Sequence, residues 1–206
     1  MEAHDASEVC VIQIDYNDSF NPDRVDFYGV SAWPTIAGNG LADVWPIDCI
    51  EDDYEVNAAV PSPLSLMITE DGMGSYTAHI TAEEDVVGAS FYMVVTLDEW
   101  VPGAEGMSHL PHHVKQFLTS TTGDAFTLMA GETVTINHTF EMQPGWDYDL
   151  MGVAAWVSRS GGTNISPCPY GALPNGNEVL QARWVPAANV TRTETTSWSH
   201  LKSMFR

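Results

Sequence analysis

Alternation of apolar and polar residues beyond residue 60 limits the fold of this chain more than any other feature. Segments of this kind, separated by turn residues, recur at the spacing of a β-sandwich. We expect strands at 64–69, 75–82, 89–97, 132–142, 150–157 and 178–184. Two of these segments alternate clearly: Phe91, Met93, Val95 and Leu97 share one face, and Val134, Ile136 and Phe140 lie opposite Thr133, Thr135, Asn137 and Thr139.

Two connecting segments are less regular. Residues 112–118 fit either a short strand or a helical turn. Residues 158–177 are rich in Gly, Pro, Ser and Asn, and they predict a long loop of the type that often carries function in compact domains.

The first 60 residues predict a smaller segment of mixed α and β structure. An apolar, β-branched run at 9–15 indicates a buried strand, and a short helix at 24–28 and a strand near 35–37 follow. Asn39-Gly40 is typical of a hairpin turn. Residues 48–59 predict an amphipathic helix, with Ile50, Tyr54 and Ala58 on one face and acidic residues on the other.

Pro61-Ser62-Pro63 ends that helix and marks the predicted boundary. We therefore expect an α+β, mostly β chain with three parts: residues 1–60, a sandwich at 61–188 and a C-terminal tail at 189–206.

The N-terminal pattern resembles part of a thioredoxin-like fold. Phe-Tyr-Gly-Val-Ser-Ala-Trp-Pro-Thr-Ile at 27–36 is similar to the helix end, cis-proline loop and strand of that fold, and Val-Ile-Gln-Ile-Asp at 11–15 is similar to its central strand. The resemblance implies a cis-proline loop at Trp33, Pro34 and Thr35. Only eight residues precede Val9, so the family's Cys-x-x-Cys helix is missing, and we expect an internal start or a longer precursor.

The remainder resembles bacterial outer-membrane lipoproteins that join a thioredoxin-like half to an immunoglobulin-like sandwich. The residues that carry this resemblance are at 63–66, 112–116, 131–134 and 178–182. It implies an immunoglobulin-like antiparallel sandwich and a location outside the cell or at the cell surface, in the bacterial envelope.

Charge and hydropathy exclude two classes of partner. The chain has 7 Lys and Arg against 28 Asp and Glu, a formal net charge of -21, which repels nucleic acid. Its apolar runs are too short to span a membrane as a helix. The excess of carboxylates is typical of a solvated surface and also suits divalent cations.

Two sets of residues are candidate metal ligands. Glu83, Glu84 and Asp85 supply the oxygen atoms that calcium prefers, although they also fit a charged hairpin tip. Imidazoles bind zinc, copper and nickel, and the chain has a histidine cluster at His109, His112 and His113, although adjacent strand residues point to opposite faces.

Three cysteines allow at most one internal disulfide, and Cys49 with Cys168 is the candidate pair in an oxidising compartment, because Cys10 lies on an apolar strand. Four sequons would accept glycans in a eukaryotic secretory pathway: Asn17, Asn137, Asn164 and Asn189.

No serine-nucleophile elbow, phosphate-binding loop or Cys-x-x-Cys pair is present. We therefore predict a non-catalytic, secreted or cell-surface protein that binds a protein partner or assembles with itself through exposed sheet edges. We expect no cofactor, and calcium is the one candidate. The alternatives are a thioredoxin-like thiol-disulfide oxidoreductase or thiol-binding chaperone, and a calcium-stabilised adhesion module.

Overall fold

The structure, a computed structural model, describes residues 22, 37–43, 49–103, 106–168, 172–173 and 175–187. The first elements are the short strands β1 (Ala37–Gly38) and β2 (Ala42–Asp43) and the helix α2 (Ile50–Ala58). The strands that follow are β3 (Leu64–Gly72), β4 (Ser75–Ala82), β5 (Val86–Gly103), β6 (Gly106–Phe117), β7 (Asp124–Leu128), β8 (Thr133–Thr139), β9 (Met151–Ser160) and β10 (Asn177–Pro186), with the 3-10 turn η2 (Tyr148–Leu150) before β9.

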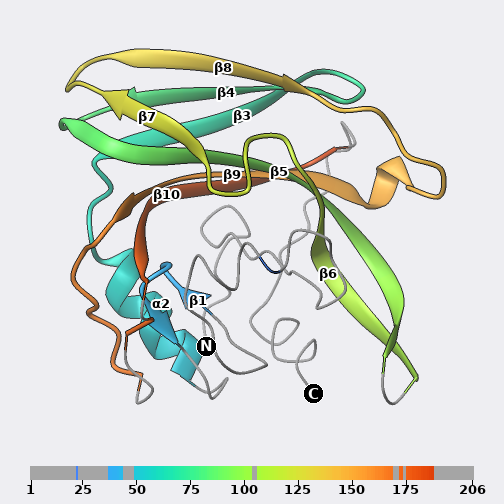
Figure 1. The fold of residues 1–206 in the computed structure, drawn as a ribbon, viewed down its shortest axis with the longest axis horizontal. Coiled ribbons are helices and arrows are strands. Elements are labelled where there is room, and N and C mark those ends of the chain that lie inside the picture. The colour runs from blue at the N-terminus through green and yellow to red at the C-terminus, as the bar shows by residue number, and fades with distance from the viewer. Residues whose placement is uncertain are drawn as a thin grey trace.

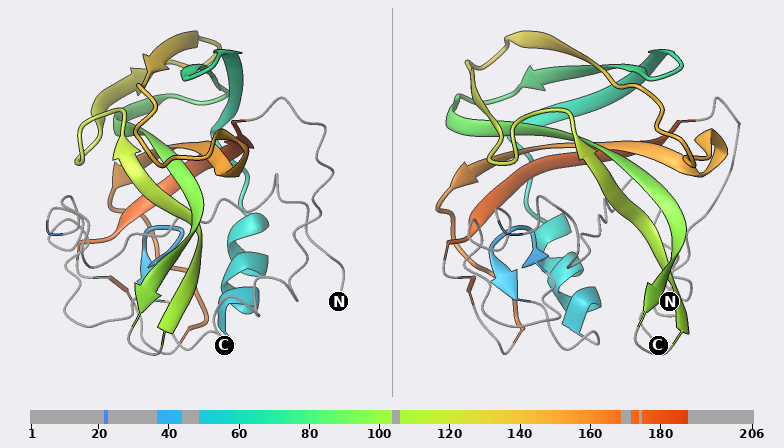
Figure 2. Two further views of the ribbon diagram at one scale, coloured as in Figure 1. Left: turned by 90° about the vertical axis from the view of Figure 1, so that its right-hand side faces the viewer. Right: turned by 45° about the vertical axis from the view of Figure 1, so that its right-hand side comes forward.

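Two antiparallel sheets pack face to face as a β-sandwich (Figure 1). The smaller sheet has the strand order β3-β4-β8. The larger sheet has the order β10-β9-β5-β6, and the short strand β7 pairs with the first half of β5. Helix α2 lies on the side of the larger sheet that faces away from the smaller one (Figures 1 and 2).

The main core lies between the two sheets and follows the predicted alternation. Phe91, Met93, Val95 and Leu97 of β5 all point into it and are at most 4% exposed. Val134 and Ile136 of β8 pack against the same core, while the threonines of β8 are exposed. The predicted inward and outward faces of both strands are confirmed.

A second apolar cluster covers the opposite face of the larger sheet. It contains Tyr92, Val94, Val114, Ala154 and Trp156, and the rings of Tyr92 and Trp156 stack with centroids 4.8 Å apart. Strand β5 is thus buried on both faces, which explains why its sequence is a nearly continuous apolar run.

The β1–β2 hairpin is tied to the end of the predicted long loop. The Asn39-Gly40 turn is confirmed, with both residues at positive φ. Backbone N–H groups of Asn177 and Val179 donate to the carbonyl oxygens of Gly40 and Asn39, at 2.9 and 3.0 Å. These contacts join residues 39–42 to a segment on the other side of residue 60. The domain boundary expected at residue 60 stays a prediction.

Helix α2 confirms the helix expected at 48–59, but its buried face differs from the expected one. Asp53 is 5% exposed, whereas Ala58 is exposed. The prediction that all acidic residues lie on the outer face is therefore wrong, because tertiary contacts with the segment around Ser166 cover the middle of the helix.

Six expected strands correspond to β3, β4, β5, β8, β9 and β10. Residues 112–117 belong to a strand, β6, which settles the open choice for that segment. The strand β7 was not expected.

Candidate binding surface

Strands β5 and β6 continue beyond the sandwich as a two-stranded extension, which we call the β5–β6 ribbon (residues 98–103 and 106–112). Pairing of β5 with β9 ends at Leu97 and Met151, whereas pairing of β5 with β6 runs on to Gly103 and Gly106. Within the described ranges, no third strand pairs with this ribbon. The ribbon projects from the body of the sandwich in both views of Figure 2. Its edges offer backbone groups to another strand.

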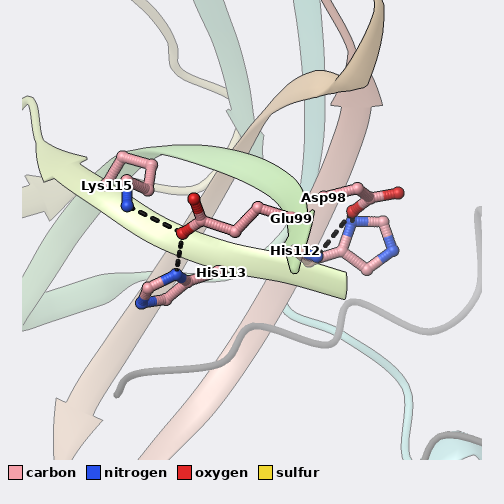
Figure 3. A network of polar contacts seen from close by, with 5 residues as sticks. All are labelled: Asp98, Glu99, His112, His113 and Lys115. Atoms are coloured by element: carbon pink, nitrogen blue, oxygen red, sulfur yellow. Dashed lines mark hydrogen bonds and ion pairs between the residues drawn. The ribbon is translucent and has the colours of Figure 1, made fainter. Parts of the chain in front are cut away.

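A network of polar contacts holds the base of the ribbon (Figure 3). The Nδ1 atom of His113 and the Nζ atom of Lys115, at 2.7 Å, both contact the Oε1 atom of Glu99. Burial of Glu99 favours its neutral form, but the hydrogen bonds from Lys115 and His113 outweigh that effect, and the pKa of Glu99 is lowered. The carboxylate therefore stays ionised and joins β5 to β6.

Bulges in β6 decide where its histidines point. Between the pairs Leu97–His113 and Glu99–Leu110, β6 has one residue more than β5, and His112 in this bulge has a positive φ of 52°. The backbone N–H of His112 donates to the Oδ1 atom of Asp98 at 2.7 Å. The His112 ring meets the indole of Trp184 edge-on at 4.5 Å, while His113 is 3% exposed.

The outer part of the ribbon presents an exposed aromatic residue. Trp100 is 63% exposed, and its ring lies 5.1 Å from that of His109, its cross-strand partner in the antiparallel register. Trp100 is thus restrained on one side and open on the other. Exposed tryptophans of this kind are enriched among the residues that dominate binding energy at protein interfaces.

The structure does not bring the candidate metal ligands together. No group of three or more His, Cys, Asp or Glu side chains that could hold a metal occurs among the described residues, which include His109, His112, His113, Glu83, Glu84 and Asp85. The three acidic residues lie on the exposed turn between β4 and β5, where the carboxylate of Asp85 accepts the N–H of Ala130 at 2.9 Å. Calcium binding stays a prediction, and no group of ligands for it is found among the described residues.

Cys49 and Cys168 are joined in a disulfide, with Cα atoms 5.7 Å apart and a sequence separation of 119. This is the pair singled out from the sequence. Cys49 is the N-cap residue of α2, and both cysteines pack with Ala42 and Ile50. One Asp53 oxygen, one turn into the helix, is buried without a hydrogen-bond partner. Burial raises the pKa of Asp53 despite hydrogen bonds to Ser166 and Asn57.

Two of the candidate glycosylation sites are described. Asn137 lies on the exposed face of β8, where its side chain contacts the Thr77 hydroxyl at 2.5 Å. Asn164 accepts the backbone N–H of Ser166 at 2.9 Å. Asn17, Asn189, Cys10 and the expected cis-proline loop at Trp33, Pro34 and Thr35 lie outside the described residues.

Sequence reasoning missed the interactions of Glu99 and Trp184. Glu99 continues the odd-numbered row of core residues on β5. An acidic residue in an apolar row needs a compensating partner, so its position in the sequence was a signal for such a contact. The Nε1 atom of Trp184 donates to the Thr96 hydroxyl at 3.0 Å, a contact between β10 and β5 that has no counterpart in sequence spacing.

Comparison with known proteins leaves the chain without an assigned family. No protein-family model matches it, and no curated protein does. A domain of the outer membrane lipoprotein Omp28 from Porphyromonas gingivalis aligns with 60% of this chain and 87% of its own, at 7% identity and a TM-score of 0.35. The solution structure of R. palustris CsgH aligns with 62% of this chain and 94% of its own, at 20% identity and a TM-score of 0.24.

TM-scores this low do not establish a shared fold, so the class of protein rests on the chain's own geometry. The described residues form a mostly β protein with an antiparallel β-sandwich. None of the helices among them has the length and apolar character needed to cross a bilayer.

Proposed function

We propose that this protein is a non-catalytic binding and assembly protein of the bacterial cell surface, which contacts its partners through exposed strand edges. The observation that carries the proposal is the β5–β6 ribbon, which extends past β9 and presents Trp100 to solvent. Because the Glu99 contacts hold the base of the ribbon, Trp100 is presented with little freedom to lose on binding.

The disulfide supports a location outside the cytosol. Disulfides persist in oxidising compartments, and the Cys49–Cys168 pair lies at the junction of α2 with the segment before β10. The net charge of -21 favours solubility in such a compartment.

The order of the strands supports an immunoglobulin-like class of sandwich. Strands β3, β4 and β8 correspond in order to strands A, B and E of that class, and β5, β9 and β10 correspond to C, F and G. Sandwiches of this class often have a tyrosine at the corner before strand F, held by a hydrogen bond of its hydroxyl. Tyr148 lies at the corresponding corner before β9, and its hydroxyl contacts Glu70 and Tyr76. This class uses loops and strand edges for recognition, which agrees with a binding role.

Peptide selection can test the ribbon as a binding surface. Strand-forming peptides selected from a random library on the whole chain should bind near Trp100, so Trp100→Ser should weaken their binding by about tenfold or more. Met73→Ser is the matched control, since Met73 is 74% exposed at the tip of the β3–β4 hairpin. Equal effects of the two substitutions would reject the ribbon as the preferred surface.

Insulin reduction separates this proposal from the oxidoreductase alternative. A non-catalytic chain should not accelerate reduction of insulin by dithiothreitol, and the Cys49→Ser/Cys168→Ser variant should behave like the wild type. Turnover that depends on these two cysteines would favour the thiol-disulfide oxidoreductase.

A further inference from the structure

From the edges of the sandwich we infer that β8 is a self-association edge, at which two copies of this chain pair their β8 strands antiparallel around a two-fold axis at Ile136. This inference rests on the proposed assembly role and names its partner and register. Strand β8 lies at the outer rim of the smaller sheet (Figure 1).

Among the edge strands of the two sandwich sheets, outside the β5–β6 ribbon, β8 alone lacks the features that normally block strand addition. Strand β3 has a bulge and the acidic residues Glu70 and Asp71, and β10 has a bulge, charged residues and Pro186. Strand β6 has two bulges, and β7 has only five residues. Strand β8 pairs with β4 without a register shift and contains no Asp, Glu, Lys, Arg or Pro. Edge strands without these features are templates for another chain.

The pattern of hydrogen bonds to β4 shows which β8 residues offer their backbone groups to a partner. The carbonyl of Glu132 accepts the N–H of Ala82 at 3.0 Å, and the N–H of Phe140 donates to Gly74 at 2.9 Å. Since hydrogen-bonded positions alternate along an antiparallel strand, the backbone N–H and C=O groups of the even-numbered residues of β8 point toward β4. The N–H and C=O groups of the odd-numbered residues, 133 to 139, therefore face outward.

A two-fold axis at Ile136 satisfies these outward groups. It places Thr135 opposite Asn137 of the second copy and Thr133 opposite Thr139, so every hydrogen-bonded pair consists of odd-numbered residues, as antiparallel pairing requires. The same axis places small polar residues opposite each other on the outer face, where cross-strand threonine pairs are favourable. The strand is thus complementary to itself, which an isologous interface requires.

Charge restricts where self-association can occur. Two chains with a net charge of -21 repel, and they can approach most closely along a strand without charged side chains. Glu132 at the start of the strand lies opposite Phe140 of the second copy in this register, rather than opposite another carboxylate. Because repulsion between the copies is screened by salt, the dimer should strengthen as salt concentration rises.

Sedimentation equilibrium of the whole chain provides the first test. A seven-residue edge buries less area than a stable dimer interface, so we expect a weak dimer that appears between about 10 and 500 µM. Thr135→Pro removes an N–H that faces outward and no bond to β4, and it should abolish the dimer. Thr135→Lys should do the same by charge, which covers the case in which the proline variant does not fold.

Thr81→Lys is the matched control, because it adds the same charge to the same face of the sheet on the central strand β4. It should leave the dimer within about twofold of the wild-type affinity. A monomeric wild type at the highest concentration, or equal dimerisation of the Thr135 variants, would overturn the inference. Neither result bears on binding through Trp100, which peptide selection tests separately. Failure of the β8 dimer can therefore be distinguished from failure of the proposed function.

Distances between spin labels test the register. In a Cys10→Ser background, labels at Thr133→Cys and at Thr139→Cys should each be separated from their copies by about six residues of strand, roughly 20 Å along the backbone. Labels at Asn137→Cys should be much closer together. Unequal separations for positions 133 and 139 would exclude the axis at Ile136.

Discussion

Removing the Cys49–Cys168 disulfide is the perturbation with the largest expected effect on stability. The bond links positions 119 apart in sequence, and it holds the N-terminus of α2 against the segment before β10. Replacing both cysteines with serine keeps their size and opens this loop. Because a cross-link restricts the unfolded chain, its loss should lower the free energy of unfolding.

The magnitude follows from the length of the loop. A closed loop of 119 residues lowers the entropy of the unfolded chain by about 16 cal/mol/K, or about 5 kcal/mol at 25 °C, in the chain-entropy treatment. Disulfides in natural proteins commonly contribute somewhat less, so we expect a loss of about 3–5 kcal/mol. For a chain of this size, that corresponds to a fall in Tm of roughly 6–20 °C.

Guanidinium denaturation and calorimetry under non-reducing conditions measure this loss. Cys10→Ser is the control, because it removes a thiol without opening the loop. Dithiothreitol should destabilise the wild type to the level of the Cys49→Ser/Cys168→Ser variant and leave that variant unchanged. A double variant within about 1 kcal/mol of the wild type would refute the reasoning.

Three further substitutions test single interactions. Burial raises the pKa of Asp53 above 3.8, so its charge destabilises the fold at neutral pH. Asp53→Asn should therefore raise Tm at pH 7 and have little effect on Tm below about pH 3. A lower Tm of the variant at pH 7 would contradict this. The pKa of Glu99 is lowered from 4.5, so its ionised form adds to the free energy of unfolding above pH 4.5, and this stabilisation is lost as pH falls through the folded pKa. Glu99→Gln should therefore make the free energy of unfolding in urea less dependent on pH in the acid range. An unchanged pH profile would contradict this. A Cβ atom at Gly152 would overlap the indole of Trp184, so Gly152→Ala should cost about 1–3 kcal/mol in chemical denaturation, and a neutral effect would show that the ring can shift.

Local patterns were sufficient to predict the sandwich strands. The alternation in β5 and β8 reflects a period of two, which any sheet imposes, so the inward residues could be read before their partners were known. The position of helix α2 was also predictable, but its buried face was not, because Asp53 is covered by contacts with a segment distant in sequence. Strand β7 was missed because it has only five residues, and an alternation limited to Phe126, Thr127 and Leu128 is too short to stand out.

The candidate binding surface was not predictable in the same way. Two bulges in β6 place His113 beside Glu99 and His112 beside Trp184, and a bulge depends on pairing with another strand. The histidine cluster therefore looked like a set of metal ligands in sequence, whereas each ring has a separate set of contacts. The exposure of Trp100 also follows only from where β9 ends relative to β5.

The sequence alone determined the strand-rich class, the inward rows of the sandwich, the helix after residue 48 and the acidic charge, because each depends on neighbours along the chain. The tertiary structure decided which strand edges are open and where the β5–β6 ribbon leaves the sandwich. These features depend on the register between distant strands, and register is set by packing across the whole sheet rather than by any one segment.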